Sequence, residues 1–541
     1  AIGAFCLDTN TTGASNVAVG FYAMKANTTA SNNTALGYSA LRFNTTGFNH
    51  TAVGYYALRA NTTSNSNTAV GWECMQANTT GSANTAIGAN SLETNTTGNY
   101  NTAVGESALK ANTTTSSNTA VGYNALNGNT TGSGTAVGAY ALEDQTTGTN
   151  NNAFGNNALR VNTTGNNNLA IGHKALFTNT TGSDSVAVGN FVLQVNTAAR
   201  NVGVGVSALV AVTTGGENTA VGEHAASTLT TGTLNVAVGR GSLGKQTTAS
   251  SNVAIGAYAM RYSNNPSGCV AVGLEALRGT SDGSPLSGNY NTGVGQGAGE
   301  DIRDGDSNTL IGYHAGRAIT GGSRNTAVGD DALTAITNGD NNTVVGEGAG
   351  DSMTTGSENT IVGQGAAEAI TTGSNNVCIG QDAGRASSPS GNIVAASNIV
   401  CLGNNNVTDL FCADTSISSS DARDKTDVED FKHGLSWITA LRPVTYRWDR
   451  RTWYSDDKSV TPDGSKKRDR IHIGFLAQEA IEVEKKHGYA DTKDNMLIAN
   501  QDADEADPSY GYKYERLVPV LVNAIKELSA EVEQLKSQLN N

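Results

Sequence analysis

A repeat of 17 residues runs through the first 403 residues of the chain and constrains its fold more than any other feature. Each unit contains a short segment such as Thr-Ala-Val that ends in a glycine, and that glycine recurs 24 times. It stands at positions 3, 20, 37, 54, 71, 88, 105, 122, 138, 155, 172, 189, 205, 222, 239, 256, 273, 295, 312, 329, 346, 363, 380 and 403. Apart from two steps of 16 residues and two insertions, at 273–295 and 380–403, the spacing is constant. A fixed period of this length is typical of a solenoid, in which each unit is buried only by its neighbours.

A single unit indicates how each coil is expected to form. The segment 68–70 alternates as a short strand with one side facing inward, and Gly71 after it permits a corner. An Ala-Leu pair, such as Ala57 and Leu58, supplies a second apolar layer. The Asn-Thr-Thr-Gly segment at 78–81 has the composition of a turn. Stacked about 4.8 Å apart, the 24 coils predict a rod on the order of 115 Å long.

The repeat changes in character along the chain. Up to about residue 256 the residues after the corner glycine are often large, as in Tyr55 and Tyr56, whereas from residue 295 they become small and acidic, as at Glu347. The change coincides with an insertion at 278–291 that contains Pro285, which we interpret as a kink or a change of cross-section. We interpret the recurring Asn-Thr-Thr segments as turns rather than as glycosylation acceptors.

Composition narrows the possible functions. With 64 glycines and only 6% aromatic residues, the chain has too little large apolar material for a conventional core of this size. The net charge of -14 argues against non-specific binding of nucleic acid. No apolar run approaches the roughly 18 residues that would suggest a transmembrane helix, so no membrane insertion is predicted.

No metal or cofactor site is predicted. The histidines at 50, 173, 224 and 314 share no metal-ligand spacing and are interpreted as surface or turn residues. The six cysteines are scattered, and we interpret them as small buried apolar side chains with free thiols.

A change in composition predicts a domain boundary near Ser420. From Ser420 to the end the chain has 19 Lys/Arg and 23 Asp/Glu, about a third of its residues, against about a tenth before it. We therefore predict a solenoid at 1–403, a junction at 404–419 and a separate domain at 420–541. Ser420 precedes Lys425 by five residues, which places a nucleophile near a possible base. The alternative is that Ser420 caps a helix and Lys425 lies on its surface.

The last 122 residues are expected to form an ordinary α+β domain. We expect a strand at 441–448, a basic loop at 450–470 with a turn at 462–464, a strand that leads into a helix at 471–479, and a last helix at 514–540. Apolar residues in that helix alternate spacings of four and three, as in a coiled coil: Leu521, Ile525, Leu528, Val532, Leu535 and Leu539. Their branching pattern on its own favours two strands.

Two resemblances add to this interpretation. The repeats are similar to the head repeats of trimeric bacterial adhesins and to repeats in phage tail fibres. The segment 420–539 resembles the intramolecular chaperone domain of endosialidases and of other phage tail spikes and fibres. The matching pieces are Ser420-Asp421-x-Arg423-x-Lys425, the Leu-x-Pro-Val-x-Tyr strand from 441, the Gly-Phe-x-Ala-Gln-Glu segment from 474 and the closing helix from Tyr514.

This second resemblance implies a folding aid that trimerises the chain and then cuts itself off. A trimer overrides the two-stranded preference of the last helix. In the family, a serine-lysine dyad performs the cut, which implies Ser420 as nucleophile and Lys425 as base. The cleavage junction would comprise Ser419, Ser420 and Asp421. The loop at 450–470 is expected to be a flexible arm that grips the solenoid.

Together these features predict a mainly β protein: a trimeric β-solenoid or β-roll rod followed by a small α+β chaperone domain that ends in a coiled coil. The main structural alternative for the rod is a β-spiral shaft. The predicted function is host attachment by a viral tail fibre of the phage type that is assembled in the host cytoplasm and located in the virion. Its expected partners are a surface glycan or protein of the host and virion proteins, the latter through an N-terminal part that is missing here. The alternatives are a cellular trimeric adhesin and a polysaccharide depolymerase. A single-turnover autoprotease is the only enzymatic activity predicted.

Overall fold

The computed structural model describes residues 1–280, 286–407, 425–451, 454, 460–501 and 510–540. The chain divides into two compact units. The solenoid unit comprises residues 1–385 and 393–403, and the C-terminal unit comprises residues 386–392 and 404–541. Each is described here by itself.

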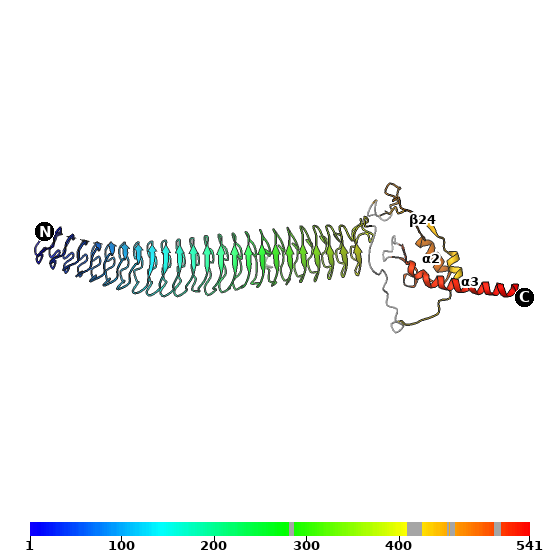
Figure 1. Ribbon diagram of the computed structural model, residues 1–541, viewed down its shortest axis with the longest axis horizontal. Coiled ribbons are helices and arrows are strands. Elements are labelled where there is room, and N and C mark those ends of the chain that lie inside the picture. Colours follow the sequence, from blue (N-terminus) through cyan, green and yellow to red (C-terminus); the bar gives the residue numbers. More distant parts are fainter. Residues whose placement is uncertain (281–285, 408–424, 452–453, 455–459, 502–509, 541) are drawn as a thin grey trace. The chain divides into compact units, whose positions relative to one another are not determined.

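The described residues of the solenoid unit form one parallel sheet of 23 strands, with one strand in each coil (Figure 1). The strands are β1 (Val17–Val19), β2 (Thr34–Leu36), β3 (Thr51–Val53), β4 (Thr68–Val70), β5 (Thr85–Ile87), β6 (Thr102–Val104), β7 (Thr119–Val121), β8 (Gly134–Val137), β9 (Asn151–Phe154), β10 (Leu169–Ile171), β11 (Val186–Val188), β12 (Val202–Val204), β13 (Thr219–Val221), β14 (Val236–Val238), β15 (Val253–Ile255), β16 (Val270–Val272), β17 (Thr292–Val294), β18 (Thr309–Ile311), β19 (Thr326–Val328), β20 (Thr343–Val345), β21 (Thr360–Val362), β22 (Val377–Ile379) and β23 (Val400–Leu402). Each strand pairs with the next one along the chain at equivalent positions, so that Ala69 lies beside Ala86. Ile2 adds an isolated bridge to Val19. The predicted β-solenoid is therefore confirmed.

The corners of the coil depend on backbone conformations that side chains rarely adopt. Gly71 has a φ of 144°, and a Cβ there would overlap the carbonyl oxygen of Gly88 in the next coil. The second and fourth residues after a corner are left-handed in most coils, as at Tyr56 (φ 57°) and Leu58 (φ 50°). Such residues cost roughly 1 kcal/mol each and persist only where the packing around them holds them in place. Stacking of the coils is what maintains this strained path.

Small apolar side chains form one half of the core. In the coil that contains β4, Ala69 at the middle of the strand and the pair Cys74 and Met75 are fully buried. Both predicted apolar layers are present in this arrangement. Of the cysteines, Cys74, Cys269, Cys378 and Cys401 are buried free thiols and Cys6 is a half-buried one, whereas Cys412 lies outside the described residues.

Asparagine side chains form much of the other half. In the first amide ladder, the asparagine of each Asn-Thr-Thr segment from Asn27 onward is buried, and most of them bind the same residue in an adjacent coil. Asn44, for example, donates from Nδ2 to Oδ1 of Asn27 (3.0 Å) and to the carbonyl of Gly47 (2.8 Å). The interpretation of these residues as turns missed their burial, and a buried amide cannot accept a glycan. The ladder ends near Asn196, and later coils carry residues such as Ile302 and Ile319 at this position.

A second amide ladder uses the residue just before each strand. The backbone N–H of Asn84 donates to Oδ1 of Asn67 (2.9 Å), and Nδ2 of Asn67 donates to the carbonyl of Gly81 (2.7 Å). The ladder reaches the last coils, where Oδ1 of Asn376 accepts from the N–H of Ile399 (3.0 Å). Buried amides are thus satisfied by the coil on either side, as buried polar groups must be.

His50 occupies a position in the second amide ladder, so its interpretation as a surface or turn residue was wrong. Its ring is buried. Nδ1 accepts from the N–H of Asn67 (3.2 Å), which places the proton of the neutral ring on Nε2, where it can be donated to the carbonyl of Ser64 (2.7 Å). The ring bridges the same backbone groups as an asparagine would.

The insertion at 278–291 does not interrupt the sheet, because β16 and β17 pair in register, with Val270 beside Thr292. What changes there is the distribution of side-chain volume inside the coil. Gly299 replaces the leucine of the Ala-Leu pair, while Ile302 replaces an asparagine and Leu310 replaces the alanine of the strand. Pro285 lies outside the described residues.

The C-terminal unit contains three α-helices and two antiparallel strand pairs among its described residues. They are α1 (Leu435–Ala440), β24 (Val444–Tyr446), β25 (His472–Gly474), α2 (Ala477–Lys486), η3 (Lys493–Asn495), β26 (Ala499–Gln501), β27 (Tyr510–Tyr512), η4 (Tyr514–Arg516) and α3 (Leu517–Leu539). β24 pairs with β25 and β26 with β27. Trp437 lies at the centre of a small core to which all three α-helices contribute. No described helix combines the length and apolar character needed to cross a bilayer.

Candidate functional site

The predicted dyad is only partly described. Ser419, Ser420 and Asp421 lie outside the described residues, whereas Lys425 is described and exposed. It is not helical, and the first described helix of this unit begins ten residues later, at Leu435. A lysine acts as a base when burial or a nearby cation lowers its pKa. Because Ser420 lies outside the described residues, the dyad stays a prediction.

The other sequence landmarks of this domain converge in space. β24, from the Leu-x-Pro-Val-x-Tyr segment, pairs with β25, whose last residue is Gly474. A Cβ on Gly474 would overlap the hydroxyl of Tyr514, and the N–H of Phe475 donates to that hydroxyl (3.1 Å). The glycine is therefore required for the close approach of Tyr514, the residue that leads into α3.

An ion pair also connects these landmarks. Arg442, just before β24, donates from Nε to Glu479 of α2 (3.1 Å), and its second contact with the same carboxylate involves Nη2. Hydrogen bonds from Arg442 lower the pKa of the Glu479 carboxyl. Both side chains are well exposed, so the pair fixes orientation more than it adds stability.

Two acidic residues that sequence reasoning missed hold the unit together. Glu484 is buried and accepts three backbone N–H groups, from Leu497 (2.8 Å), Ile498 (3.0 Å) and Ala499 (2.7 Å). Such a carboxylate fixes the segment that leads into β26. Its spacing offered a signal, because Glu484 lies four residues after the buried Ala480, on the apolar face of α2.

The second missed residue, Glu527 of α3, accepts from the N–H of Leu435 at the start of α1 (2.6 Å). Gly434 lies so close to α3 that a Cβ there would be 2.5 Å from the backbone nitrogen of Ala524. α1 is therefore docked directly on the first turns of α3.

α3 has two distinct parts. Leu517, Val520 and Ala524 are buried in the unit. The six residues of the predicted coiled-coil seam, Leu521, Ile525, Leu528, Val532, Leu535 and Leu539, are all exposed. The seam is thus an apolar surface that the single chain leaves uncovered.

The basic segment predicted as an arm lines a cavity of about 410 Å³ within the C-terminal unit. The Arg450 guanidinium lies 4.5 Å from the Trp448 ring centroid. Burial, followed by the nearby charge of Arg468, lowers the pKa of Arg450. Residues 452–453 and 455–459 of this segment lie outside the described residues, so its role as an arm stays a prediction.

Comparison with curated proteins and with solved structures found no match for the chain. The comparison with protein families found one. Residues 420–489 match the model of the family described as Chaperone of endosialidase, a range that includes Ser420, Lys425, α1, β24, β25 and α2.

Proposed function

We propose that the chain is a trimeric fibre protein of the phage tail-fibre or tail-spike type, located in the virion and used for attachment to the host surface. In this proposal its C-terminal unit trimerises the chains and guides folding of the solenoid. One combination carries the proposal: a solenoid whose strands all present an uncovered apolar residue, joined to a segment that matches the Chaperone of endosialidase.

The outward face of the sheet supports self-association. The last residue of each of the 23 described strands is Val, Ile, Leu or Phe, and none of these side chains is buried. The first residue of the three-residue segment is β-branched in nearly every coil. Extended apolar surfaces of this kind mark interfaces in soluble proteins. Because the stripe repeats at every coil, the surface that fits it best is the same stripe on parallel copies of the chain.

The exposed seam of α3 gives independent support. A helix with apolar residues at alternating spacings of three and four buries them against other helices of the same kind. The stripe of the solenoid and the seam of α3 are separate elements of one chain, and parallel association would cover both.

The proposal extends to self-cleavage at the junction. Ser420 would act as nucleophile and Lys425 as base, and the exposed Lys425 requires cover to become one. Association of three chains would supply that cover. Cleavage is then expected only after assembly, which would release the chaperone when its task is complete.

Sedimentation of the full chain tests the proposal. We expect the Ser420→Ala chain, in which the proposed cleavage is blocked, to sediment as a species of three times 55.5 kDa. Val121→Asp together with Val137→Asp places charges in the apolar stripe and is expected to weaken the trimer. Thr131→Asp adds a charge at an exposed turn between them and should leave it intact. A stable monomer of the wild-type chain would contradict the proposal.

A further inference from the structure

Aromatic side chains form a continuous column on the first coils of the solenoid unit. Phe21, Tyr38, Tyr55 and Trp72 each follow a corner glycine directly. Their ring centroids are separated by 5.5, 5.3 and 6.4 Å, with ring planes inclined by no more than 16°. All four are exposed, and Trp72 has half of its surface accessible.

A second column, beside the first, alternates cations with aromatic rings. Lys25 lies 4.8 Å from the Tyr22 ring centroid. Arg42 lies 4.5 Å from Tyr22 and 4.9 Å from Phe43. The next cation, Arg59, lies 4.5 Å from the ring centroid of Tyr56 and 5.6 Å from that of Phe43. We call the two columns together the aromatic–cation surface.

The three cations of this surface have no anionic partner among the described residues. Neither Asp8 nor Glu73, the nearest acidic residues in the sequence, forms an ion pair with them in the described structure. The Nε atoms of Arg42 and Arg59 are buried and make no hydrogen bond. Both side chains are only half-buried, so an external acceptor would meet the outer N–H groups of each guanidinium rather than the buried Nε.

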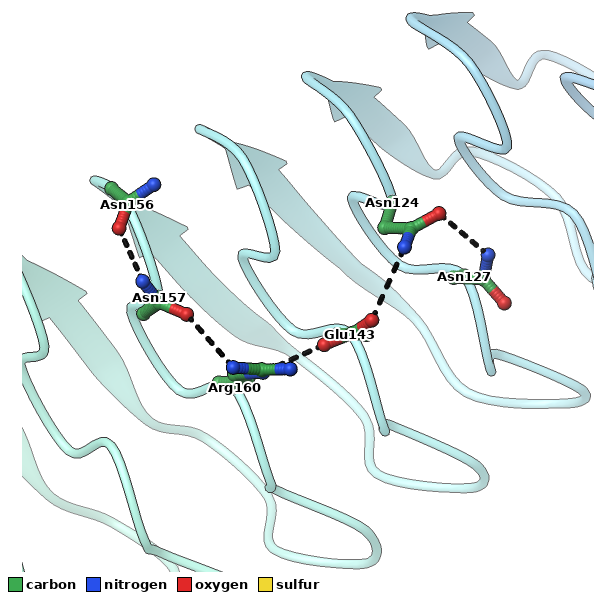
Figure 2. Close-up of polar contacts among 6 residues, drawn as sticks. All are labelled: Asn124, Asn127, Glu143, Asn156, Asn157 and Arg160. Atoms are coloured by element: carbon green, nitrogen blue, oxygen red, sulfur yellow. Dashed lines mark hydrogen bonds and ion pairs between the residues drawn. The ribbon is translucent and has the colours of Figure 1, made fainter. Parts of the chain in front are cut away.

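In the coils of Asn124, Glu143 and Arg160, acidic and amide side chains occupy some of the same positions (Figure 2). Arg160, equivalent to Arg42, donates from Nε to Glu143 one coil away (2.7 Å). Asn157 and Asn124 stand where Tyr22 stands in its coil, and both join this hydrogen-bonded chain. Arg160 is therefore paired with an acidic residue of the chain, whereas among the described residues the cations of the aromatic–cation surface are not.

Trp72 ends the aromatic column in a way that leaves a ring face available. Tyr55 stacks on one face of the indole. The next residue in the column is Ala89, which is too small to cover the opposite face. The negative face of an aromatic ring attracts the positively polarised C–H groups of a sugar ring.

The first coils carry a net positive charge, which favours an anionic ligand. Residues 1–72 contain three Lys/Arg and one Asp/Glu, whereas residues 73–403 contain 12 Lys/Arg and 22 Asp/Glu. An anionic polymer would therefore be attracted to the first coils and repelled by the others. Guanidinium groups bind carboxylates with two parallel hydrogen bonds.

We propose that the aromatic–cation surface binds a carboxylated polysaccharide, with carboxylates on Arg42 and Arg59 and a sugar ring on the free face of Trp72. This inference rests on the proposed attachment function and names the ligand class and the site.

Binding of alginate oligosaccharides, a polyuronate, to the full chain tests this site against dextran of equal length. We expect saturable binding of alginate that weakens with added salt, and no binding of dextran. Arg42→Gln with Arg59→Gln should weaken alginate binding about tenfold or more, which corresponds to the loss of one charge-assisted contact or more. Trp72→Ala should weaken it as well. Arg160→Gln, the matched control, should leave it unchanged, because Arg160 is already paired.

Several results would overturn the inference. The first two are absence of alginate binding and equal binding of dextran. The third is an equal loss of alginate affinity in Arg160→Gln, which would indicate that binding depends on charge attraction alone. Loss of the trimer in the Arg42→Gln/Arg59→Gln variant would assign the surface to a contact between copies of the chain. If the wild type is a trimer but does not bind alginate, the proposed ligand site is refuted and the proposed function is not. If the wild type is a monomer, the proposed function is refuted.

Discussion

His50 shows how strictly the core of the solenoid unit selects for neutral side chains. Burial lowers the pKa of its ring to about 4. Protonation would also place a hydrogen on Nδ1, the atom that accepts from the N–H of Asn67. The folded chain therefore favours the neutral ring, whereas a histidine in the unfolded chain titrates near 6.5.

Replacement of His50 by asparagine should make the stability of the surrounding coils less sensitive to acid. Between pH 6.5 and about 4 the unfolded chain binds a proton at this histidine that the folded chain does not bind. The free energy of unfolding is therefore highest above pH 6.5 and falls as the pH drops, by at most about 3 kcal/mol per chain. Hydrogen exchange of residues 44–84 at pH 4.5 should be slower in His50→Asn than in the wild type, and equal at pH 7.5. His224→Asn, at an exposed histidine, is the control. Equal exchange at pH 4.5 would show that His50 is not the sensitive group.

Alanine substitutions at two glycines with left-handed backbone conformation distinguish the cost of backbone strain from the cost of crowding in the core. Gly348 has a φ of 60° and open space where a Cβ would lie, whereas a Cβ on Gly299, at the same φ, would lie 2.7 Å from Leu277 Cδ2 and from Leu310 Cδ1. Gly348→Ala should cost only the conformational term, about 1 kcal/mol. Gly299→Ala should cost about 1 to 3 kcal/mol more, because it overpacks the core. Thermal unfolding of both variants measures the difference, and equal losses would contradict this account.

At the scale of the elements, the sequence predicted the strand, the corner and the stacking, but not the polar core. The glycine period and the Thr-Ala-Val alternation are local signals of a coil. The burial of Asn44 or Asn67 is not local, because it depends on in-register stacking that places each amide opposite a backbone group of the next coil. Assigning a periodic polar residue to a turn does not show whether its side chain is buried, and for His50 the assignment to the surface or a turn was wrong.

The C-terminal unit shows a similar limit. The landmarks could be named from the sequence, and the contacts among Gly474, Tyr514 and Phe475 explain why they occur together. The dyad could also be named, and it stays a prediction because Ser420 lies outside the described residues. Glu484 and Glu527 were missed because acidic residues on helices are usually solvated.

Early coils bury an asparagine and a leucine where later coils bury an isoleucine and a glycine. The effects of substitutions at these two positions on stability should therefore be coupled. Asn112→Ile in the first amide ladder should cost about 3 kcal/mol, because it removes the bonds of Asn112 to Asn95 and Thr115 and crowds Leu109. Later coils place isoleucine at this position together with a glycine, as at Ile302 and Gly299. Adding Leu109→Gly should therefore make the double variant about 1 kcal/mol more stable than the sum of the single losses. Unfolding free energies of the cycle decide this, and strict additivity would contradict it.

At the scale of the whole molecule, assembly and cleavage should be ordered in time. Ser420→Ala removes the proposed nucleophile and Lys425→Ala the proposed base, and we expect both to assemble without cleavage. The wild type should give two fragments that meet near residue 420 on a denaturing gel, with first-order kinetics that begin only after the trimer forms. Cleavage of Ser420→Ala at the same site would refute the dyad and leave the folding role.

The in-register ladders also have an evolutionary consequence. Every coil contacts only the coil before it and the coil after it, at equivalent positions. Unequal recombination that duplicates or deletes one 17-residue unit would therefore give new neighbours only to the coils on either side of the change. The length of the solenoid can therefore change during evolution in steps of about 4.8 Å, one coil at a time, without a new core sequence.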